Sequence, residues 1–236
     1  KEKIAALLRF SSTADESGVQ SVSLKDYIDR MQEDQEKIFY VTADNYQAAK
    51  TSPHLEIFRK KGIEVLLMGE RIDEWLMSHL TEFNEKQFQS IAGADLDLSD
   101  LDDEESKKAK EIAEKEVEGI LERVKTALGD KVENVKFTHR LTDSPACIVA
   151  DENGMTTQMA KLMASAGQPV PDTKYHFELN PEHHLVKLMA NVQEEEQFKL
   201  WSEVLYDQAA LSEQGSLKDP SVFVKNLNGL LASLAK

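Results

Sequence analysis

The chain has 236 residues, 41% hydrophobic and 30% charged, which is enough apolar surface for one large or two small folded domains. Its 28 basic and 43 acidic residues give a net charge of −15, which argues against nucleic acid and anionic membranes as partners because both attract clustered basic residues. No apolar run is long enough to span a bilayer. The single cysteine, Cys147, excludes an internal disulfide framework and is typical of a reducing compartment.

The first 93 residues alternate between helical and strand patterns. Ser23, with Asp26 three residues later, has the spacing of a capping box and predicts a helix from residue 24. Asp44 is expected to cap the helix that follows the first strand. The expected elements are helices at 24–32, 45–50, 52–61 and 71–83 and strands at 37–43, 65–68 and 88–91. This alternation predicts a small α/β layer with parallel strands.

An acidic segment follows at residues 94–106. Clustered carboxylates can bind Ca²⁺, but the segment lacks the glycine and the ligand spacing of an EF-hand loop. We therefore interpret it as a solvated linker between a domain at 1–93 and a second domain at 107–236.

The second domain is predicted to be α+β, with a small sheet and then helices only. One continuous helix is expected from about residue 105 to Gly129, where the apolar periodicity stops. Strands at 132–137, 146–150 and 174–179 follow, and the remaining helices are expected from Pro181, at 195–212 and from 219 to the end. The pattern alone favours docking of the last helix on its predecessor within the chain. Pairing with a second chain as a four-helix bundle is the alternative.

Two features allow both a core and a binding interpretation. Met155, Met159, Leu162 and Met163 form one apolar stripe of a predicted helix, which most often faces a protein core but which also suits adaptable binding surfaces. Trp75 lies at the edge of the apolar stripe formed by Ile72, Leu76, Leu80 and Phe83. It is either half buried over the core or an aromatic anchor for a partner.

Candidate catalytic and metal sites are weak. The sequence has no phosphate-binding glycine loop and no GxSxG element. Cys147 lies in an apolar run, where cysteine is usually an inert small side chain, and only His139 is considered as a partner for it. Glu182, His183 and His184 lack the spacing of a helical zinc site, so the histidines are expected to cap or pack a helix start. No catalytic residue, metal or cofactor is predicted in this chain.

Several segments together resemble the 90-kDa heat-shock chaperone family in its bacterial form. They occur in the family's order and extend over nearly the whole chain. They are SLKDYIDRM (23–31), IFYVTAD (38–44), SPHLE (52–56), KKGIEVLLM (60–68), IDEW (72–75), LTEF (80–83), HRLTDSPACIV (139–149) and FELNPEH (177–183).

The resemblance implies a fragment: the end of the middle domain, a small three-layer α/β/α fold, followed by the C-terminal dimerisation domain. The family's ATP- and Mg²⁺-binding domain would lie outside this chain, which would therefore not be an enzyme by itself. The implied role is a cytoplasmic chaperone fragment that forms homodimers and binds partly unfolded client proteins. The alternative is a structural interaction module whose Met helix is buried and binds no client.

The resemblance also assigns roles to residues. The resemblance implies that clients are contacted by Trp75, Ser78, Met155, Met159, Leu162 and Met163. It also implies a dimer formed through a bundle of four helices, with the residues Phe198, Trp201, Leu205, Phe223, Leu227, Leu230, Leu231 and Leu234. If the Met stripe points outward, only small residues such as Ala160 and Ala164 remain to anchor its helix. We therefore expect that helix to be mobile or docked on another chain.

Overall fold

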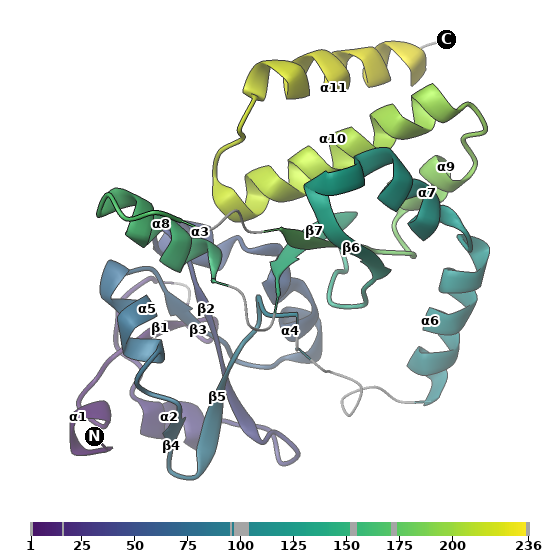
Figure 1. Ribbon diagram of the computed structural model, residues 1–236. Helices are drawn as coiled ribbons and strands as arrows, with labels where there is room; N and C mark the ends of the chain where they lie inside the picture. The colour runs from purple at the N-terminus through teal and green to yellow at the C-terminus, as the bar shows by residue number, and fades with distance from the viewer. Residues whose placement is uncertain are drawn as a thin grey trace. The chain divides into compact units, whose positions relative to one another are not determined.

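The chain divides into two units, which we describe separately (Figure 1). The structure is a computed structural model and describes residues 2–15, 17–94, 96, 104–151, 155–170 and 174–234. Unit 1 comprises Lys1–Leu96 and Met155–Pro171, and unit 2 comprises Asp97–Gly154 and Asp172–Lys236. The greater part of the acidic segment, residues 95 and 97–103, lies outside the described residues.

Unit 1 is a mixed sheet with helices. Its elements are α1 (Glu2–Ala5), β1 (Ser11–Ser12), α2 (Leu24–Asp29), β2 (Lys37–Thr42), α3 (Tyr46–Lys50), a 3₁₀ turn (Pro53–Leu55), α4 (Glu56–Lys61), β3 (Leu66–Met68), α5 (Arg71–Met77), β4 (Glu82–Phe83), β5 (Lys86–Ser90) and α8 (Thr157–Ser165). The described strands pair in the order β1-β3-β2-β5-β4. The central strands β3, β2 and β5 run parallel, as predicted, and β1 and β4 add antiparallel edges.

Helices cover both faces of this sheet. Successive residues of β2 point to opposite faces, so each face offers apolar side chains against which helices pack. Ile38 belongs to a buried cluster with Tyr27 of α2 and Met77 of α5. The next residue, Phe39, packs edge-on against Phe58 of α4, with ring centroids 4.9 Å apart. The sequence prediction of an α/β architecture for this part is confirmed.

Tyr27 joins α2 to β2 and to the segment just before β3 through its buried hydroxyl. The hydroxyl accepts a hydrogen bond from the backbone N–H of Phe39 at 3.0 Å and donates one to the carbonyl of Glu64 at 2.7 Å. Burial raises the pKa of Tyr27 above its ordinary value, so the hydroxyl remains a donor. The helix itself begins at the predicted capping box, in which Ser23 Oγ accepts from the N–H of Asp26 at 3.1 Å.

Two local predictions for unit 1 were wrong. Asn45, not Asp44, caps α3: its Oδ1 accepts from the N–H of Ala48 at 2.9 Å. Helix α5 ends at Met77 instead of reaching Phe83, which lies in β4. Of its predicted core stripe, Ile72 is 66% exposed, and the buried residues of α5 are Asp73 and Met77.

The chain can turn sharply after β4 because Asn84 and Glu85 both have positive φ, 47° and 62°. Two such residues suit the tight turn that joins antiparallel strands. The apolar residues at 80 and 83 therefore reach the core from a loop and a strand, although their spacing imitates a longer helix.

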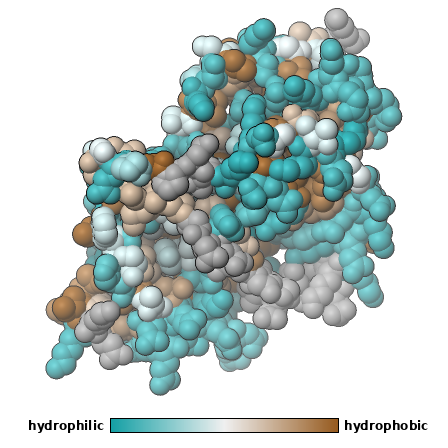
Figure 2. Space-filling view, in the orientation of Figure 1, coloured by the Kyte–Doolittle hydropathy of each residue, from teal (hydrophilic) through white to brown (hydrophobic). Residues whose placement is uncertain are grey.

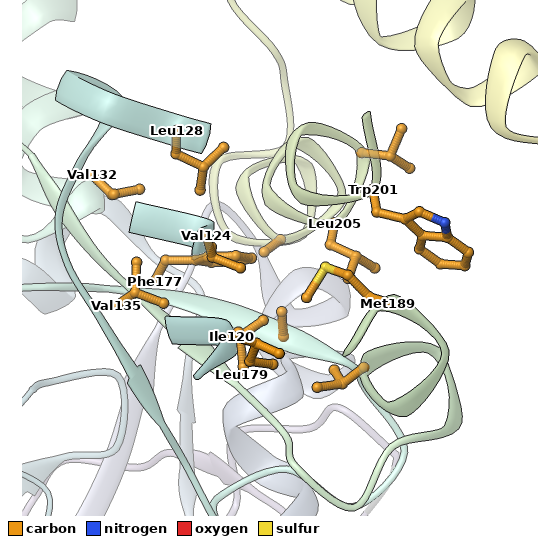
Figure 3. Packing of buried hydrophobic residues seen from close by; sticks show 14 of the residues in the cluster. Ile120, Val124, Leu128, Val132, Val135, Phe177, Leu179, Met189, Trp201 and Leu205 are labelled. Carbon is orange, nitrogen blue, oxygen red and sulfur yellow. The ribbon is translucent and has the colours of Figure 1, made fainter. Parts of the chain in front are cut away.

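Unit 2 packs helices against a small sheet. Its elements are α6 (Glu104–Glu116), α7 (Ile120–Leu128), a 3₁₀ turn (Gly129–Lys131), β6 (Val132–Phe137), β7 (Ala146–Ala150), β8 (Tyr175–Leu179), α9 (His184–Ala190), α10 (Glu195–Gln214) and α11 (Pro220–Leu234). The strand order is β6-β8-β7, with β8 parallel to β6 and antiparallel to β7. The core lies between the sheet, α7 and α10, and Figure 3 shows Phe177, Val124 and Leu205 meeting there.

Two helical predictions in unit 2 have different outcomes. The single helix predicted up to Gly129 is divided into α6 and α7 by Gly119, whose φ of 88° is left-handed and interrupts the helical backbone. The expectation that a histidine caps the helix after Pro181 is confirmed, since His183 Nδ1 accepts from the N–H of Leu185 at 3.1 Å.

The central strand of this sheet also carries a buried charge. Glu178 is 0% exposed and forms ion pairs with Arg140 at 3.0 Å and with Lys136 at 3.1 Å. Burial disfavours the charged carboxylate, but the two cations outweigh it and hold the pKa of Glu178 below its ordinary value. Glu178 is therefore ionised in the folded protein at neutral pH.

Candidate functional site

Helix α8, which carries the Met stripe, docks on unit 1 through polar side chains. Lys161 Nζ lies 2.6 Å from a carboxylate oxygen of Asp44, and Thr156 Oγ1 donates to Glu74 Oε2 at 3.0 Å. Thr156 also caps the helix by accepting from the N–H of Met159 at 3.0 Å. The expected anchor of small residues is therefore replaced by charged and hydroxyl groups.

A cavity of about 290 Å³ lies under this helix, beside the carboxyl end of β2. Four residues of α8 at helical spacing line it: Gln158, Lys161, Leu162 and Ser165. The charged residues on the other walls are Asp44, Glu70, Arg71 and Glu74. The face of α8 that meets unit 1 is thus mainly polar.

The Met stripe lies next to this docking face and shares only Leu162 with it. Met155, Met159 and Met163 do not line the cavity, and all four residues of the stripe are partly exposed. None of them belongs to the described core clusters of either unit. Figure 2 shows apolar colour mixed with hydrophilic colour over α8. An amphipathic helix normally buries its apolar face in a core, whereas this stripe belongs to no described core cluster and is only partly covered.

Trp75 and Ser78 lie on and just after α5, the helix that α8 contacts. Trp75 is 51% exposed, and Ile72, one turn before it, is also exposed. Ser78 is exposed, but its hydroxyl donates to the carbonyl of Trp75 at 2.8 Å. The structure therefore brings Trp75 and the Met stripe, which are far apart in sequence, onto neighbouring helices of one unit.

The residues assigned to dimerisation fall into two groups. Phe198, Trp201 and Leu205 of α10 are at most 2% exposed and belong to the core of unit 2, and Leu230 of α11 is 4% exposed. These four hold their own subunit together. Phe223 and Leu227 are partly buried against the same core. The docking of α11 on α10, which the pattern favours, is confirmed.

The outer side of α11 remains open in the single chain. Leu231 is 56% exposed and Leu234 is 55% exposed. Val224, which the sequence prediction omitted, is 52% exposed one heptad before Leu231. Fewer residues of α11 are therefore available for direct contact with a second chain than the sequence prediction assigned to dimerisation.

The candidate chemistry of Cys147 finds no support in the geometry. Cys147 is 1% exposed, and its Sγ lies 3.9 Å from Glu178 Oε2. His139 points to Glu114, with Nε2 2.8 Å from a carboxylate oxygen. In the part of the chain that the structure describes, no group of three or more histidine, cysteine, aspartate or glutamate side chains is arranged so that it could hold a metal ion. Within the same part, no helix has both the length and the apolar character needed to cross a membrane.

Sequence reasoning missed Asp44, Glu74, Thr156 and Lys161. Asp44 was expected at a helix cap, and the other three carry no local pattern that distinguishes them from ordinary surface residues. Asp44 and Lys161 are 117 residues apart in the chain. Nothing in a single sequence connects them at that separation.

Comparison with known proteins gives a consistent result. The family model described as Hsp90 protein matches residues 1–236. The chain is 63% identical over 236 residues to chaperone protein HtpG of Pseudoalteromonas translucida, 59% over 236 residues to that of Colwellia psychrerythraea and 60% over 233 residues to that of Cronobacter sakazakii. These alignments cover 99–100% of this chain but only 36–37% of each relative, so the chain corresponds to a fragment of such proteins. Since both comparisons extend over essentially its whole length, the chain belongs to the Hsp90 protein family.

Proposed function

We propose that this chain is the dimerising and client-binding part of a chaperone. Its relatives are named chaperone proteins, and this chain spans about 37% of their length. The observation that supports client binding is that α8 docks through polar groups while its Met stripe stays partly exposed. Methionine is flexible and polarizable, so such a stripe adapts to varied apolar surfaces.

The proposed client surface combines this stripe with Trp75. Partly unfolded proteins expose apolar side chains, and each side chain that is fully covered contributes about 1.5–3 kcal/mol. A few partly covered contacts hold a client with modest affinity once ordering costs are subtracted. The chain's net charge of −15 favours solubility for a protein that exposes apolar surface.

The competing function is a structural interaction module with a buried Met helix. That function requires Met155, Met159 and Met163 to lie in a core, whereas all three are partly exposed. This observation favours the client-binding proposal.

Homodimerisation is proposed through the outer face of α11. Val224, Leu231 and Leu234 are exposed there, and a two-fold arrangement would pair this face with the same face of a second copy. In the predicted four-helix bundle, α10 contributes by packing against α11 within its own chain. Two client surfaces in one dimer would raise avidity through effective concentration.

ATP and Mg²⁺ binding are assigned to the part of the relatives that lies outside this chain. We propose the cytoplasm as the compartment, because a single cysteine excludes an internal disulfide framework and is typical of a reducing compartment. The role assigned to this chain is therefore binding, without chemistry of its own.

The Trp75→Arg variant tests the client surface. Loss of an aromatic anchor should weaken binding by about 2 kcal/mol, or roughly thirtyfold. Binding is measured by fluorescence anisotropy with labelled ribonuclease A that has been reduced and carbamidomethylated and therefore stays unfolded. Val19→Arg, at a residue 60% exposed in the same unit, is the matched control for the added charge. Equal affinities of the wild-type chain and Trp75→Arg would contradict the proposed surface.

A further inference from the structure

We propose that Asp44, Glu74, Thr156 and Lys161 are positioning residues that assemble the client surface from its two halves. This inference rests on the proposed function. Trp75 reaches the surface on α5, and the Met stripe reaches it on α8, a helix that enters unit 1 from a distant part of the chain. The contacts between these halves decide whether they form one face.

The first contact joins α8 directly to α5. Glu74 accepts from Thr156 at 3.0 Å, and Glu74 is the residue immediately before Trp75. Thr156 caps α8 with the same hydroxyl oxygen. One side chain therefore starts the helix and ties it next to the tryptophan, so the register between the two halves is set at this point.

The second contact holds the middle of α8. Lys161 Nζ pairs with Asp44 at 2.6 Å, just beyond the carboxyl end of β2. Together the two contacts fix α8 at its start and one turn further on, which defines the direction in which Met159 and Met163 point.

The docking is marginal, and this makes the ion pair important. Beneath α8 lies a cavity of about 290 Å³ instead of a packed apolar core. Glu74 Oε1 is buried and has no hydrogen-bond partner among the described residues, which opposes docking. A helix of nine residues is also marginal in isolation, so α8 should lose its helical structure when it is released.

Two single charge reversals and their combination test the proposal in the complete 236-residue chain. Lys161→Asp and Asp44→Lys each replace an attraction with a repulsion, and the double variant restores opposite charges in exchanged positions. Each single variant should weaken binding of the unfolded ribonuclease A probe about threefold to thirtyfold, and the double variant should regain most of the loss. Lys161→Arg, which keeps the charge, should bind like the wild-type chain.

A matched control separates position from net charge. Lys187 of α9 forms a 2.7 Å ion pair with Glu116 in unit 2, with side-chain exposure of 40% and 53% against 33% and 46% for Lys161 and Asp44. Lys187→Asp changes the net charge as Lys161→Asp does and should leave probe binding unchanged. Hydrogen exchange of the α8 backbone amides gives a readout that needs no client: protection should fall in both single variants and return in the double variant.

Three results would overturn the inference. The first is unchanged probe binding in both single variants. The second is tighter probe binding in either single variant, which would mean that α8 covers the site. The third is a double variant that binds the probe no more tightly than the single variants. Failure of the wild-type chain to bind the probe would instead refute the proposed function, an outcome that is visible before any variant is compared.

Discussion

The exposed leucines of α11 give a quantitative prediction for the dimer. The variant Leu231→Ala/Leu234→Ala removes three carbons from each of two side chains that are 56% and 55% exposed in the single chain. Complete burial contributes about 0.8 kcal/mol per methylene, so covering the exposed half of each leucine contributes about 1.2 kcal/mol. A two-fold dimer contains both leucines twice, and the total is about 5 kcal/mol. The dissociation constant should therefore rise by about three to four orders of magnitude.

Sedimentation velocity over a concentration series measures this constant for the wild-type chain and the variant. Ile112→Ala on α6, at a residue 59% exposed, is the control for loss of an exposed apolar side chain elsewhere in unit 2. Because Leu231 and Leu234 are not part of the unit 2 core cluster, the variant should keep the wild-type unfolding midpoint at concentrations at which both proteins are monomeric. A dissociation constant within threefold of the wild-type value, or an equal loss in the control, would refute the reasoning.

Three further predictions concern stability and are measured by urea unfolding. Glu178→Gln should destabilise the folded chain by about 3–5 kcal/mol at pH 7 because it removes the buried negative charge that pairs with the buried Arg140. The folded-state pKa of Glu178 lies below its ordinary value of 4.5, so its stabilisation is present above that pH and is lost as the pH falls below it; the variant should lack this loss. Tyr27→Phe should cost about 1–3 kcal/mol because it removes the acceptor of a buried amide in β2. Gly119→Ala should cost about 1–2 kcal/mol because its φ of 88° is strained for alanine.

Each of these has an outcome that would contradict it. Gly229→Ala, in the interior of α11 with ordinary contact distances to its neighbours, should instead stabilise by about 0.5–1 kcal/mol, so equal effects at both glycines would exclude the backbone explanation. A wild-type pH dependence retained in Glu178→Gln would assign the acid sensitivity to other carboxyls. An unchanged midpoint in Tyr27→Phe would mean that water replaces the hydroxyl.

Local features of the fold were predictable from sequence because their causes lie within a few residues. The capping box at Ser23 depends only on neighbours in the chain and was found where predicted. Helix α5 was predicted too long because Leu80 and Phe83 continue its apolar spacing although they belong to the next turn and strand. Periodicity records which residues are buried and does not distinguish the elements that bury them.

The candidate site was only half predictable for the same reason. Trp75 and the Met stripe carry residue types that suit binding, so the sequence resemblance could name them. The contacts that bring them together, such as Lys161 with Asp44, join common surface residues at long separation. Similarly, no local signal distinguishes Phe198, which is buried in its own subunit, from Leu231, which is exposed.

The connection between β7 and β8 has a consequence for how the proposed client surface can change during evolution. These strands are antiparallel neighbours, which a turn of two residues could join, yet the chain inserts residues 151–174 between them. The described residues of this insertion contribute nothing to the core cluster of unit 2. Substitutions, lengthening or exchange of the insertion should therefore leave that core intact. For the proposed client surface, this means that selection can change the recognition residues without a penalty in the folding of the domain that carries the insertion.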